Sequence, residues 1–266
     1  MLKPVTLVTG ASSGLGAALA RVFAEHGDEV VLVARRAAEL AALADRIAAA
    51  GPARPQAIAL DLASADAGAT LDVKLREAGL EPAVVVNCAG FGLFGAAADN
   101  DLAEQLAMID LNARSLTELS LRWLDSIARH KGGVLNVSSI AAFMPRPGMA
   151  VYHATKAYAL SFTEALHREM APRGVRVTAL CPGPIRTEFL ARAGTRESDY
   201  PRFLFRSTER IAREGYEGFM RGERLIIPGR VNKVAPWLPR FLPRGLILTI
   251  THAGRRERNR TNTIDA

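Results

Sequence analysis

With 266 residues, 49% of them hydrophobic and 23% charged, the chain has the size and composition of one folded domain, which excludes a disordered or collagen-like protein. The formal net charge of +7 is concentrated in residues 229–266, so the body of the chain lacks the basic stripe of a nucleic-acid-binding protein. Two cysteines, Cys88 and Cys181, are too few for a disulfide framework, and no signal-peptide pattern opens the chain, so we expect a cytoplasmic protein.

Strand patterns and helix patterns alternate along the chain. Short β-branched runs predict strands at residues 5–9, 29–34, 56–60, 84–87, 134–138 and 175–180. Amphipathic runs predict helices at residues 15–26, 37–50, 65–77, 101–129 and 151–171. Most of these strands are apolar on both faces, as in a parallel sheet covered by helices on both sides. We therefore predict a single α/β domain with a doubly wound parallel sheet, and a ligand crevice at the carboxyl ends of its strands.

The alternation stops after Pro182. Residues 185–223 are polar and helical in pattern, and residues 225–227 predict a last strand. We therefore divide the domain into a cofactor-binding and catalytic core (1–187), a substrate-loop region (188–223), and a last strand with a basic tail (224–266). Apolar side chains in the second part suggest a pocket for a lipophilic ketone, aldehyde or 3-oxoacyl group, or equally a piece of the core; they are Phe189, Leu190, Phe203, Leu204, Phe205 and Phe219.

A glycine-rich turn follows the first predicted strand and precedes a helical pattern. Its glycines have the spacing G-x-x-x-G-x-G. Glycine allows a tight turn and the close approach of a phosphate to backbone N–H groups at a helix N-terminus. A purely structural turn is the alternative, but the strand–turn–helix context favours nucleotide binding. The predicted contacts come from Gly10, Ser12, Ser13, Gly14, Leu15 and Gly16.

Basic residues end the second predicted strand, at the place where an NAD-preferring protein has an acid for the ribose 2′-OH. Because a guanidinium binds phosphate with two charge-assisted hydrogen bonds, Arg35 predicts NADP in preference to NAD, with Arg36 as a weaker candidate. The alternative is a pair of solvated arginines. Asp61, after the third strand, either accepts a bond from the adenine amino group or caps the next turn.

A second constellation lies in the predicted helix 151–171. Tyr152 and Lys156 are four residues apart and share one helix face, and Ser139 ends the fifth strand. A Tyr-x-x-x-Lys pair by itself arises often by chance, but the serine and the upstream glycine turn make the combination specific. His153 lies on another face of the helix, so we expect a helix-surface role for it rather than acid–base chemistry.

Together these features resemble the short-chain dehydrogenase/reductase family in its single-domain, Rossmann-like form. The resemblance covers residues 5–187 and rests on Thr9-Gly10-x3-Gly14-x-Gly16, Asn87-Cys88-Ala89-Gly90, Asn112, Ser139, Tyr152, Lys156 and Pro182-Gly183-x-Ile185-x-Thr187. Cys88 stands where the family more often has Asn, which leaves the turn intact. The resemblance implies an NADP-dependent oxidoreductase that interconverts a carbonyl and an alcohol by hydride transfer.

The resemblance also implies a role for each site residue. Tyr152 protonates the carbonyl oxygen, Ser139 orients that oxygen, and Lys156 holds the nicotinamide ribose. A free phenol has a pKa of ~10, and one cation ~4 Å away at an effective dielectric of ~20 stabilises the phenolate by roughly 4 kcal/mol, so Lys156 suffices to activate it. Asn112 holds a water that links Lys156 to solvent. Further cofactor contacts are implied for Asn87, Ala89, Gly90, Pro182, Gly183, Ile185 and Thr187.

We expect a small-molecule substrate, no metal, no nucleic acid, and a homodimer or homotetramer. The alternative function is a catalytically silent NADP-binding sensor or scaffold, whose expected signature, a broken Tyr152/Lys156 pair or a missing Ser139, is not seen. The tail has apolar residues at helical spacing beside its basic ones. It either packs over the crevice or a subunit interface, or docks on an anionic membrane or an acidic acyl-carrier protein.

Overall fold

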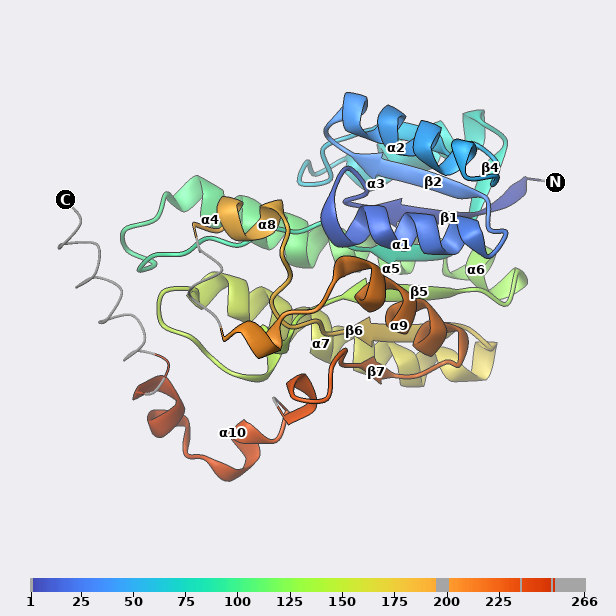
Figure 1. Cartoon of the computed structure of the whole chain (residues 1–266). Coiled ribbons are helices and arrows are strands. Elements are labelled where there is room, and N and C mark those ends of the chain that lie inside the picture. Colours follow the sequence, from blue (N-terminus) through green and yellow to red (C-terminus); the bar gives the residue numbers. More distant parts are fainter. Residues whose placement is uncertain (1, 195–200, 235, 250, 252–266) are drawn as a thin grey trace.

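Seven parallel strands form the centre of the structure, a computed structural model that describes residues 2–194, 201–234, 236–249 and 251 (Figure 1). They are β1 (Lys3–Thr9), β2 (Val30–Ala34), β3 (Gln56–Ala59), β4 (Leu80–Asn87), β5 (Gly133–Val137), β6 (Arg176–Leu180) and β7 (Leu225–Ile226). Their order in the sheet is β3-β2-β1-β4-β5-β6-β7, so the chain reverses its direction of travel between β3 and β4. Such a reversal leaves a crevice between the loops that follow β1 and β4.

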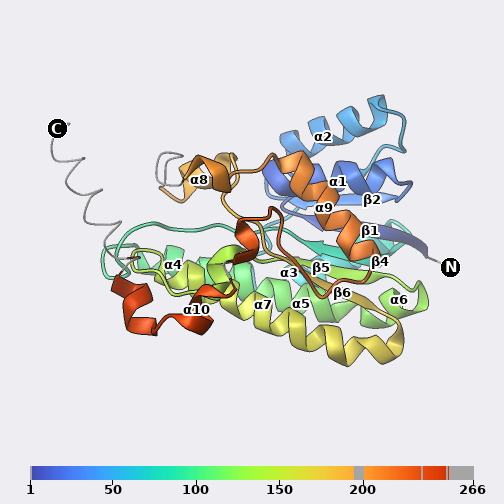
Figure 2. The ribbon, with the colours of Figure 1, turned by 60° about the horizontal axis from the view of Figure 1, so that its bottom comes forward.

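Helices cover both faces of the sheet, as the doubly wound prediction requires (Figure 2). One face carries α1 (Gly14–Glu25), α2 (Ala37–Ala49) and α9 (Thr208–Met220). The other face carries α3 (Ala67–Glu77), α5 (Leu116–Arg122), α6 (Leu124–Arg129) and α7 (Ala150–Met170). The short helices α4 (Leu102–Ile109), α8 (Glu188–Arg192) and α10 (Leu238–Phe241) lie at the carboxyl end of the sheet, opposite the N-terminus (Figure 1).

The two helix layers enclose two apolar cores, one on each side of the sheet. Phe23 of α1 and Phe219 of α9 are fully buried in the first, with their rings 6.0 Å apart. Leu71 of α3 and Leu119 of α5 lie in the second. The prediction of strands apolar on both faces is thus confirmed, and Phe219 belongs to the core rather than to a pocket.

The predicted helix 101–129 is interrupted twice. Residues Asp110–Ser115 form a π-helix between α4 and α5, and Trp123 leaves the helical conformation with φ of −117° before α6 begins. π-Helical turns insert one extra residue per turn and occur often at functional sites. The periodicity of the sequence does not reveal this turn because its residues keep an ordinary amphipathic pattern.

The strand predicted at residues 84–87 begins earlier, at Leu80, although Pro82 lies within it. Proline interrupts a strand that has neighbours on both sides, because it lacks the N–H donor. Pro82 lies where β4 pairs with β1 alone, next to a register shift between Val5 and Thr6, and pairing with β5 starts only at Val84. The strand therefore accommodates a residue that the sequence pattern treats as a boundary.

The C-terminal part consists of short helical pieces at the open end of the sheet. After α10, residues 244–249 are helical, Ile247 is buried, and Thr251 lines the large cavity described below. No helix in the described ranges is long and apolar enough to cross a membrane. Residues 252–266, which include four of the arginines of the tail, lie outside the described residues.

Candidate active site

A cavity of about 1120 Å³ opens at the carboxyl ends of the strands, at the position predicted for the ligand crevice. Most of the predicted site residues line it, namely Gly10, Ser12, Ser13, Gly14, Leu15, Gly16, Arg35, Asp61, Ala89, Gly90, Ser139, Tyr152, Lys156, Pro182, Gly183, Ile185 and Thr187. Two predicted residues, Asn87 and Asn112, are not part of the lining and are buried instead.

The turn between β1 and α1 has a shape that only glycine allows. Gly10 and Gly14 have φ of +67° and +54°. A Cβ atom on Gly10 would lie 2.8 Å from Cα of Ala89, and one on Gly16 would lie 2.3 Å from the carbonyl oxygen of Gly10. The first turn of α1 contains no acidic residue, and Ser13 forms no side-chain cap, so the N-terminal N–H groups and the helix dipole favour an anion. The turn therefore fits a dinucleotide diphosphate.

Two arginines border the cavity beside this turn. Arg36 donates to Ser12 Oγ from Nε at 3.3 Å and from Nη2 at 3.2 Å, and Nη2 lies 3.0 Å from Oε2 of Glu188 on α8. Arg35 lines the cavity and forms no ion pair with any described residue. A guanidinium without an ion-pair partner in the described part of the chain, at the edge of a nucleotide cavity, suits an added phosphate.

The loops after β3 and β6 close around the same turn. Asp61 Oδ1 accepts a hydrogen bond from the backbone N–H of Ala63 at 3.0 Å, so Asp61 caps the next turn while it also lines the cavity. A Cβ atom on Gly14 would lie 3.2 Å from Cγ2 of Thr187, so Thr187 lies against the glycine turn. The loop that the sequence assigns to the nicotinamide side is thus in contact with the loop that fits the diphosphate.

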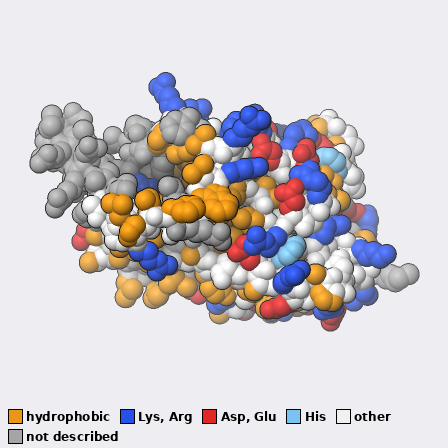
Figure 3. Space-filling view, turned by 90° about the horizontal axis from the view of Figure 1, so that it is seen from below, with side chains coloured by type: hydrophobic (Ala, Val, Ile, Leu, Met, Phe, Trp, Pro, Cys, Tyr) orange, Lys and Arg blue, Asp and Glu red, His pale blue; other side chains and the backbone are white. Residues whose placement is uncertain are grey.

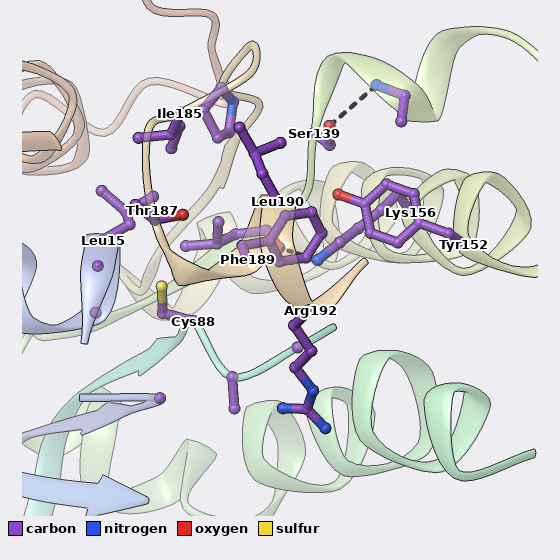
Figure 4. A pocket seen from close by; sticks show the side chains of 18 of the residues that line it. Leu15, Cys88, Ser139, Tyr152, Lys156, Ile185, Thr187, Phe189, Leu190 and Arg192 are labelled. Atoms are coloured by element: carbon purple, nitrogen blue, oxygen red, sulfur yellow. Dashed lines mark hydrogen bonds between the residues drawn. The ribbon is translucent and has the colours of Figure 1, made fainter. Parts of the chain in front are cut away.

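One turn of α7 places Tyr152 and Lys156 side by side, as their spacing predicts. Lys156 Nζ lies 5.9 Å from the centre of the Tyr152 ring. Figure 4 shows the Tyr152 hydroxyl directed toward the side of the cavity that carries the Ser139 hydroxyl. Ser138 donates to the carbonyl oxygen of Lys156 at 2.7 Å, whereas Ser139 Oγ accepts from the N–H of Ala141 at 3.1 Å and retains its proton for a substrate oxygen. Of the two serines, Ser139 is the one placed for chemistry.

Burial controls the ionisation of the groups around Tyr152. Lys156 is 6% exposed, its Nζ donates to the carbonyl oxygen of Val137 at 2.9 Å, and burial lowers its pKa to about 8. Lys156 therefore remains mainly a cation at neutral pH, and a buried cation favours the ionised form of a neighbouring phenol. Burial raises the pKa of both Cys88 and Cys181 to about 12, so neither thiol is a nucleophile at neutral pH.

Asn112, in the π-helix, ties the loop after β4 to α7. Its Oδ1 accepts from the N–H of Phe91 at 3.1 Å, and its Nδ2 donates to the carbonyl oxygen of Phe91 at 2.9 Å and to Thr155 Oγ1 at 3.1 Å. A Cβ atom on Gly90 would lie 2.8 Å from Asn112 Oδ1 and 3.5 Å from Lys156 Nζ. Asn112 thus shapes the wall beside Lys156, and its predicted role in holding a water stays a prediction.

The side chain of Asn87 points away from the cavity. Its Nδ2 donates to Asn136 Oδ1 at 2.8 Å and to Ser120 Oγ at 3.0 Å, so it is directed toward β5 and α5. The three residues that follow it, from Cys88 to Gly90, line the cavity.

The prediction of a helix-surface position for His153 is wrong. His153 is 8% exposed, lines the cavity, and its Nδ1 forms a 2.7 Å hydrogen bond with the carbonyl oxygen of Met144. Burial lowers its pKa to about 4, so it is a neutral group that holds the loop after β5. Helical periodicity does not signal this position, because the loop that contacts His153, which carries Met144, lies outside the helix.

Two cavity residues of α8 carry no motif and were missed by sequence reasoning. Glu188 contacts Arg36, and the Arg192 guanidinium lies 4.4 Å from the centre of the Phe91 ring. Figure 4 shows Arg192 extending away from Tyr152. Burial lowers the pKa of Arg192, with the positive charge of Arg35 as a second cause. The cavity therefore has a polar, charged half.

The half of the cavity near Tyr152 is mainly apolar. The Phe189 ring lies 5.6 Å from the Tyr152 ring. The Phe205 ring is instead stacked with Arg186, whose Cζ lies 5.2 Å from the centre of the ring. The Phe203 side chain lies outside the described residues. Other apolar side chains that line the cavity are Ile140, Met144, Met149, Leu190 and Leu204. The site combines a phenol beside a buried ammonium with a second hydroxyl and an apolar wall. Such a set of groups can hold a carbonyl oxygen and donate a proton to it.

Comparison with known proteins identifies relatives of this arrangement. The family model for short chain dehydrogenase matches residues 4–198. The chain is similar to serine 3-dehydrogenase of Agrobacterium fabrum, 37% identical over 190 residues, or 71% of this chain and 75% of the relative. It is also similar to sulfoacetaldehyde reductase 2 of Chromohalobacter salexigens, 36% identical over 197 residues, or 73% of this chain and 77% of the relative.

A solved structure shows the same architecture with a bound nucleotide. The short-chain dehydrogenase from Sphingobium yanoikuyae in complex with NADPH is 30% identical and superposes with a TM-score of 0.78. The match covers 90% of this chain and 96% of that chain. The likeness therefore extends beyond the residues matched by the family model.

Proposed function

The chain belongs to the short-chain dehydrogenase/reductase family and is an NAD(P)-dependent oxidoreductase, and on this basis we propose that it uses NADPH to reduce a lipophilic ketone, aldehyde or 3-oxoacyl group. The observation that carries this proposal is the placement of Tyr152, Lys156 and Ser139 in one cavity with a glycine turn that fits a diphosphate. The half with the glycine turn has the groups that bind a nucleotide, and the half with Tyr152 has the groups that bind and protonate a carbonyl oxygen.

When bound, NADPH would supply the hydride for the carbonyl carbon, and side chains of the protein would bind and protonate the carbonyl oxygen. Ser139 donates a hydrogen bond to the carbonyl oxygen and fixes its position. Tyr152 delivers a proton to the same oxygen as negative charge develops there. The buried cation of Lys156 stabilises the resulting phenolate. The N–H groups at the start of α1, with Gly10, Gly14 and Gly16, would hold the diphosphate.

The preference for NADPH over NADH is proposed from Arg35. It lines the cavity beside the glycine turn and has no ion-pair partner among the described residues, so its guanidinium is available to a 2′-phosphate. Arg36 is the weaker candidate because Ser12 and Glu188 already engage it. In the same scheme Thr187, Pro182, Gly183 and Ile185 bound the nicotinamide side, and Asp61 the adenine side.

The lipophilic substrate is proposed from the cavity wall near Tyr152. Phe189 and Leu190 from α8 and Leu204 from the following segment line the cavity together with Met149. These contacts support the proposal that residues 188–223 contribute to the substrate region. Removing water from such a wall favours an apolar substrate body by ~25 cal/mol per Å² of buried surface.

The experiment is NADPH oxidation by the purified chain against short ketones, aromatic aldehydes and acyl thioesters, compared with the Tyr152→Phe variant. Tyr152→Phe removes one hydroxyl that matters mainly in the transition state. It should therefore abolish most turnover and leave NADPH affinity nearly unchanged. Turnover at the wild-type rate would contradict the assignment of Tyr152. A chain that binds NADPH but reduces no carbonyl would favour the silent sensor, which the intact Tyr152, Lys156 and Ser139 set disfavours.

We further propose that the chain is a cytoplasmic homo-oligomer. Helix α4 carries three exposed apolar residues at positions i, i+4 and i+7, namely Leu102 (69% exposed), Leu106 (51%) and Ile109 (42%). An apolar stripe of this kind on the surface suits a symmetric interface between copies. The cytoplasmic location is supported by free thiols at Cys88 and Cys181.

We also propose that the tail docks on an anionic lipid surface. Phe241 is 77% exposed and Trp237 is 51% exposed, and their rings stack with centres 6.4 Å apart. Figure 3 shows hydrophobic and basic side chains next to each other on the face seen from below. Exposed aromatic residues beside Lys and Arg suit the interfacial region of a bilayer. The acyl-carrier protein remains the alternative partner. Packing of the tail over the cavity or a subunit interface remains the alternative to docking, and buried Ile247 and the cavity-lining Thr251 favour it.

A further inference from the structure

Helix α8 places the carboxylate of Glu188 at the nucleotide half of the cavity. Glu188, its first residue, places Oε2 3.0 Å from Nη2 of Arg36. The same guanidinium donates to Ser12 in the glycine turn and lies 3.7 Å from Glu39 at the start of α2. The glycine turn, the start of α2 and the start of α8 therefore meet at Arg36, and Glu188 is the residue contributed by the substrate-loop region.

The carboxylate lies at the edge of the nucleotide cavity. Ser12, Arg35, Arg36 and Glu188 all line that cavity. The two arginines are neighbours in sequence, but the structure pairs only Arg36 with acids and leaves Arg35 without an ion pair among the described residues. Glu188 thus removes part of the positive charge that this edge would otherwise offer to a phosphate.

We propose that Glu188 is a specificity-determining residue that reduces the preference for NADPH over NADH by holding Arg36 away from the 2′-phosphate. The proposal rests on the assignment of this edge to the 2′-phosphate in the proposed function. A carboxylate competes with a phosphate for a guanidinium, whereas a ribose 2′-OH carries no charge and does not compete. Glu188 therefore acts against a nucleotide with a 2′-phosphate and is neutral toward one without it.

The size of the effect follows from exposure. The side chains of Arg36 and Glu188 are 41% and 67% exposed, so solvent screens their pairing. Exposed pairs of this kind change an equilibrium by at most about fivefold. We expect Glu188→Gln, which keeps the shape and removes the charge, to increase affinity for a 2′-phosphorylated nucleotide by about threefold to fivefold.

The test measures binding without catalysis. Isothermal titration of the full chain with 2′,5′-ADP and with 5′-AMP compares two ligands that differ by the 2′-phosphate. Glu188→Gln should increase the affinity for 2′,5′-ADP and leave the affinity for 5′-AMP unchanged. High salt should reduce the difference between wild type and variant. Glu209→Gln is the matched control, because Glu209 is 65% exposed and its Oε1 lies 3.5 Å from Nη2 of Arg21. This control should change the affinity for neither ligand.

Coupling to Arg36 is tested by repeating the substitution in an Arg36→Ala background, where Glu188→Gln should give no gain. Equal affinities of wild type and Glu188→Gln for 2′,5′-ADP would overturn the inference, and so would a gain that persists without Arg36 or appears for both ligands. The proposed cofactor preference is judged separately, from the wild-type ratio of the two affinities. A ratio of one would contradict that preference, whatever Glu188→Gln does.

Discussion

At the scale of single residues, burial determines which groups around the cavity carry charge. The cavity is lined by three buried titratable side chains, Lys156, His153 and Cys88. Burial favours the neutral form of each. It lowers the pKa of Lys156 to about 8 and that of His153 to about 4, and it raises that of Cys88 to about 12. Lys156 is therefore the cation placed next to Tyr152 at neutral pH. The charge that the reaction needs is thus concentrated on one buried group.

Arg35 is the residue on which cofactor preference should depend. Losing a charge-assisted hydrogen bond costs ~1.5 to 3 kcal/mol, so Arg35→Ala should weaken NADPH by roughly 10-fold to 150-fold and change NADH little. Fluorescence titration with each nucleotide measures this. Arg46→Ala, which removes an exposed arginine from α2, is the control. Equal losses for both nucleotides, or a wild type that prefers NADH, would contradict the role of Arg35.

His153 should make the fold sensitive to acid. Its pKa is about 4 in the folded protein and ~6.5 in the unfolded chain, so between these values the unfolded chain binds more protons. The free energy of unfolding therefore falls as pH decreases from 6.5 toward 4, by ~3 kcal/mol from this group, and the contribution is fully present above that window. Urea denaturation across this range should show a weaker pH dependence for His153→Gln. Identical slopes for both proteins would show that His153 is not the source.

At the scale of elements, loops from both halves of the sheet are held in place by a few polar contacts. The π-helix Asp110–Ser115 turns Asn112 toward the backbone of Phe91 and toward Thr155 of α7. Without it, the loop that carries Ala89 and Gly90 would lose these hydrogen bonds and keep only its apolar contacts with α7, such as the packing of Phe91 in one cluster with Tyr152. The amide of Asn112 therefore supplies a polar link between α7 and the loop after β4.

Asn112→Ala should loosen this loop. The substitution leaves the N–H and C=O groups of Phe91 without their partner in a buried place, at ~1 to 3 kcal/mol for each group. We expect a lower free energy of unfolding, weaker NADPH binding and faster amide exchange at Phe91. Asn112→Asp retains an acceptor for the Phe91 N–H and should protect that amide from exchange better than Asn112→Ala does. Unchanged exchange at Phe91 in the alanine variant would exclude this link.

At the scale of the whole molecule, the functional parts gather at one end. The cavity, α4, α8 and the described part of the tail lie at the carboxyl end of the sheet, while the N-terminal strand β1 begins at the opposite end (Figure 1). The tail reaches the cavity through Thr251 and leaves Phe241 exposed. A surface to which the tail binds would therefore lie close to the cavity.

Phe241→Ser tests the proposed docking with little risk to the fold, because this side chain is 77% exposed. Wild type should sediment with vesicles of phosphatidylcholine and phosphatidylglycerol at low salt, but not at high salt or with phosphatidylcholine alone. Burying an aromatic ring contributes ~1.5 kcal/mol or more, so Phe241→Ser should weaken binding by about tenfold. Val73→Ser, at an exposed site on α3, is the control. Salt-insensitive binding, or a clear preference for acyl-carrier thioesters over free ones, would contradict lipid docking.

The sequence by itself determined the features that depend on neighbours along the chain. The alternating strands and helices follow from local periodicity, which the doubly wound sheet confirms. Tyr152 and Lys156 share a face because any helix brings residues four apart together, and the glycine turn is readable because only glycine permits its backbone at Gly10 and Gly14. These features depend on local backbone geometry and not on which element packs against them.

Tertiary structure decided the features that depend on neighbours distant in the chain. Burial of His153, the direction of Asn87, and the π-helical turn at Asn112 each depend on the element packed opposite, which periodicity does not report. The pairing of Glu188 with Arg36 joins residues far apart in sequence, and no motif marks Glu188. Pro82 lies inside a strand because β5 begins to pair only beyond it. Contacts across the sheet and between loops form only when the chain is folded, so their consequences for charge and specificity appear only there.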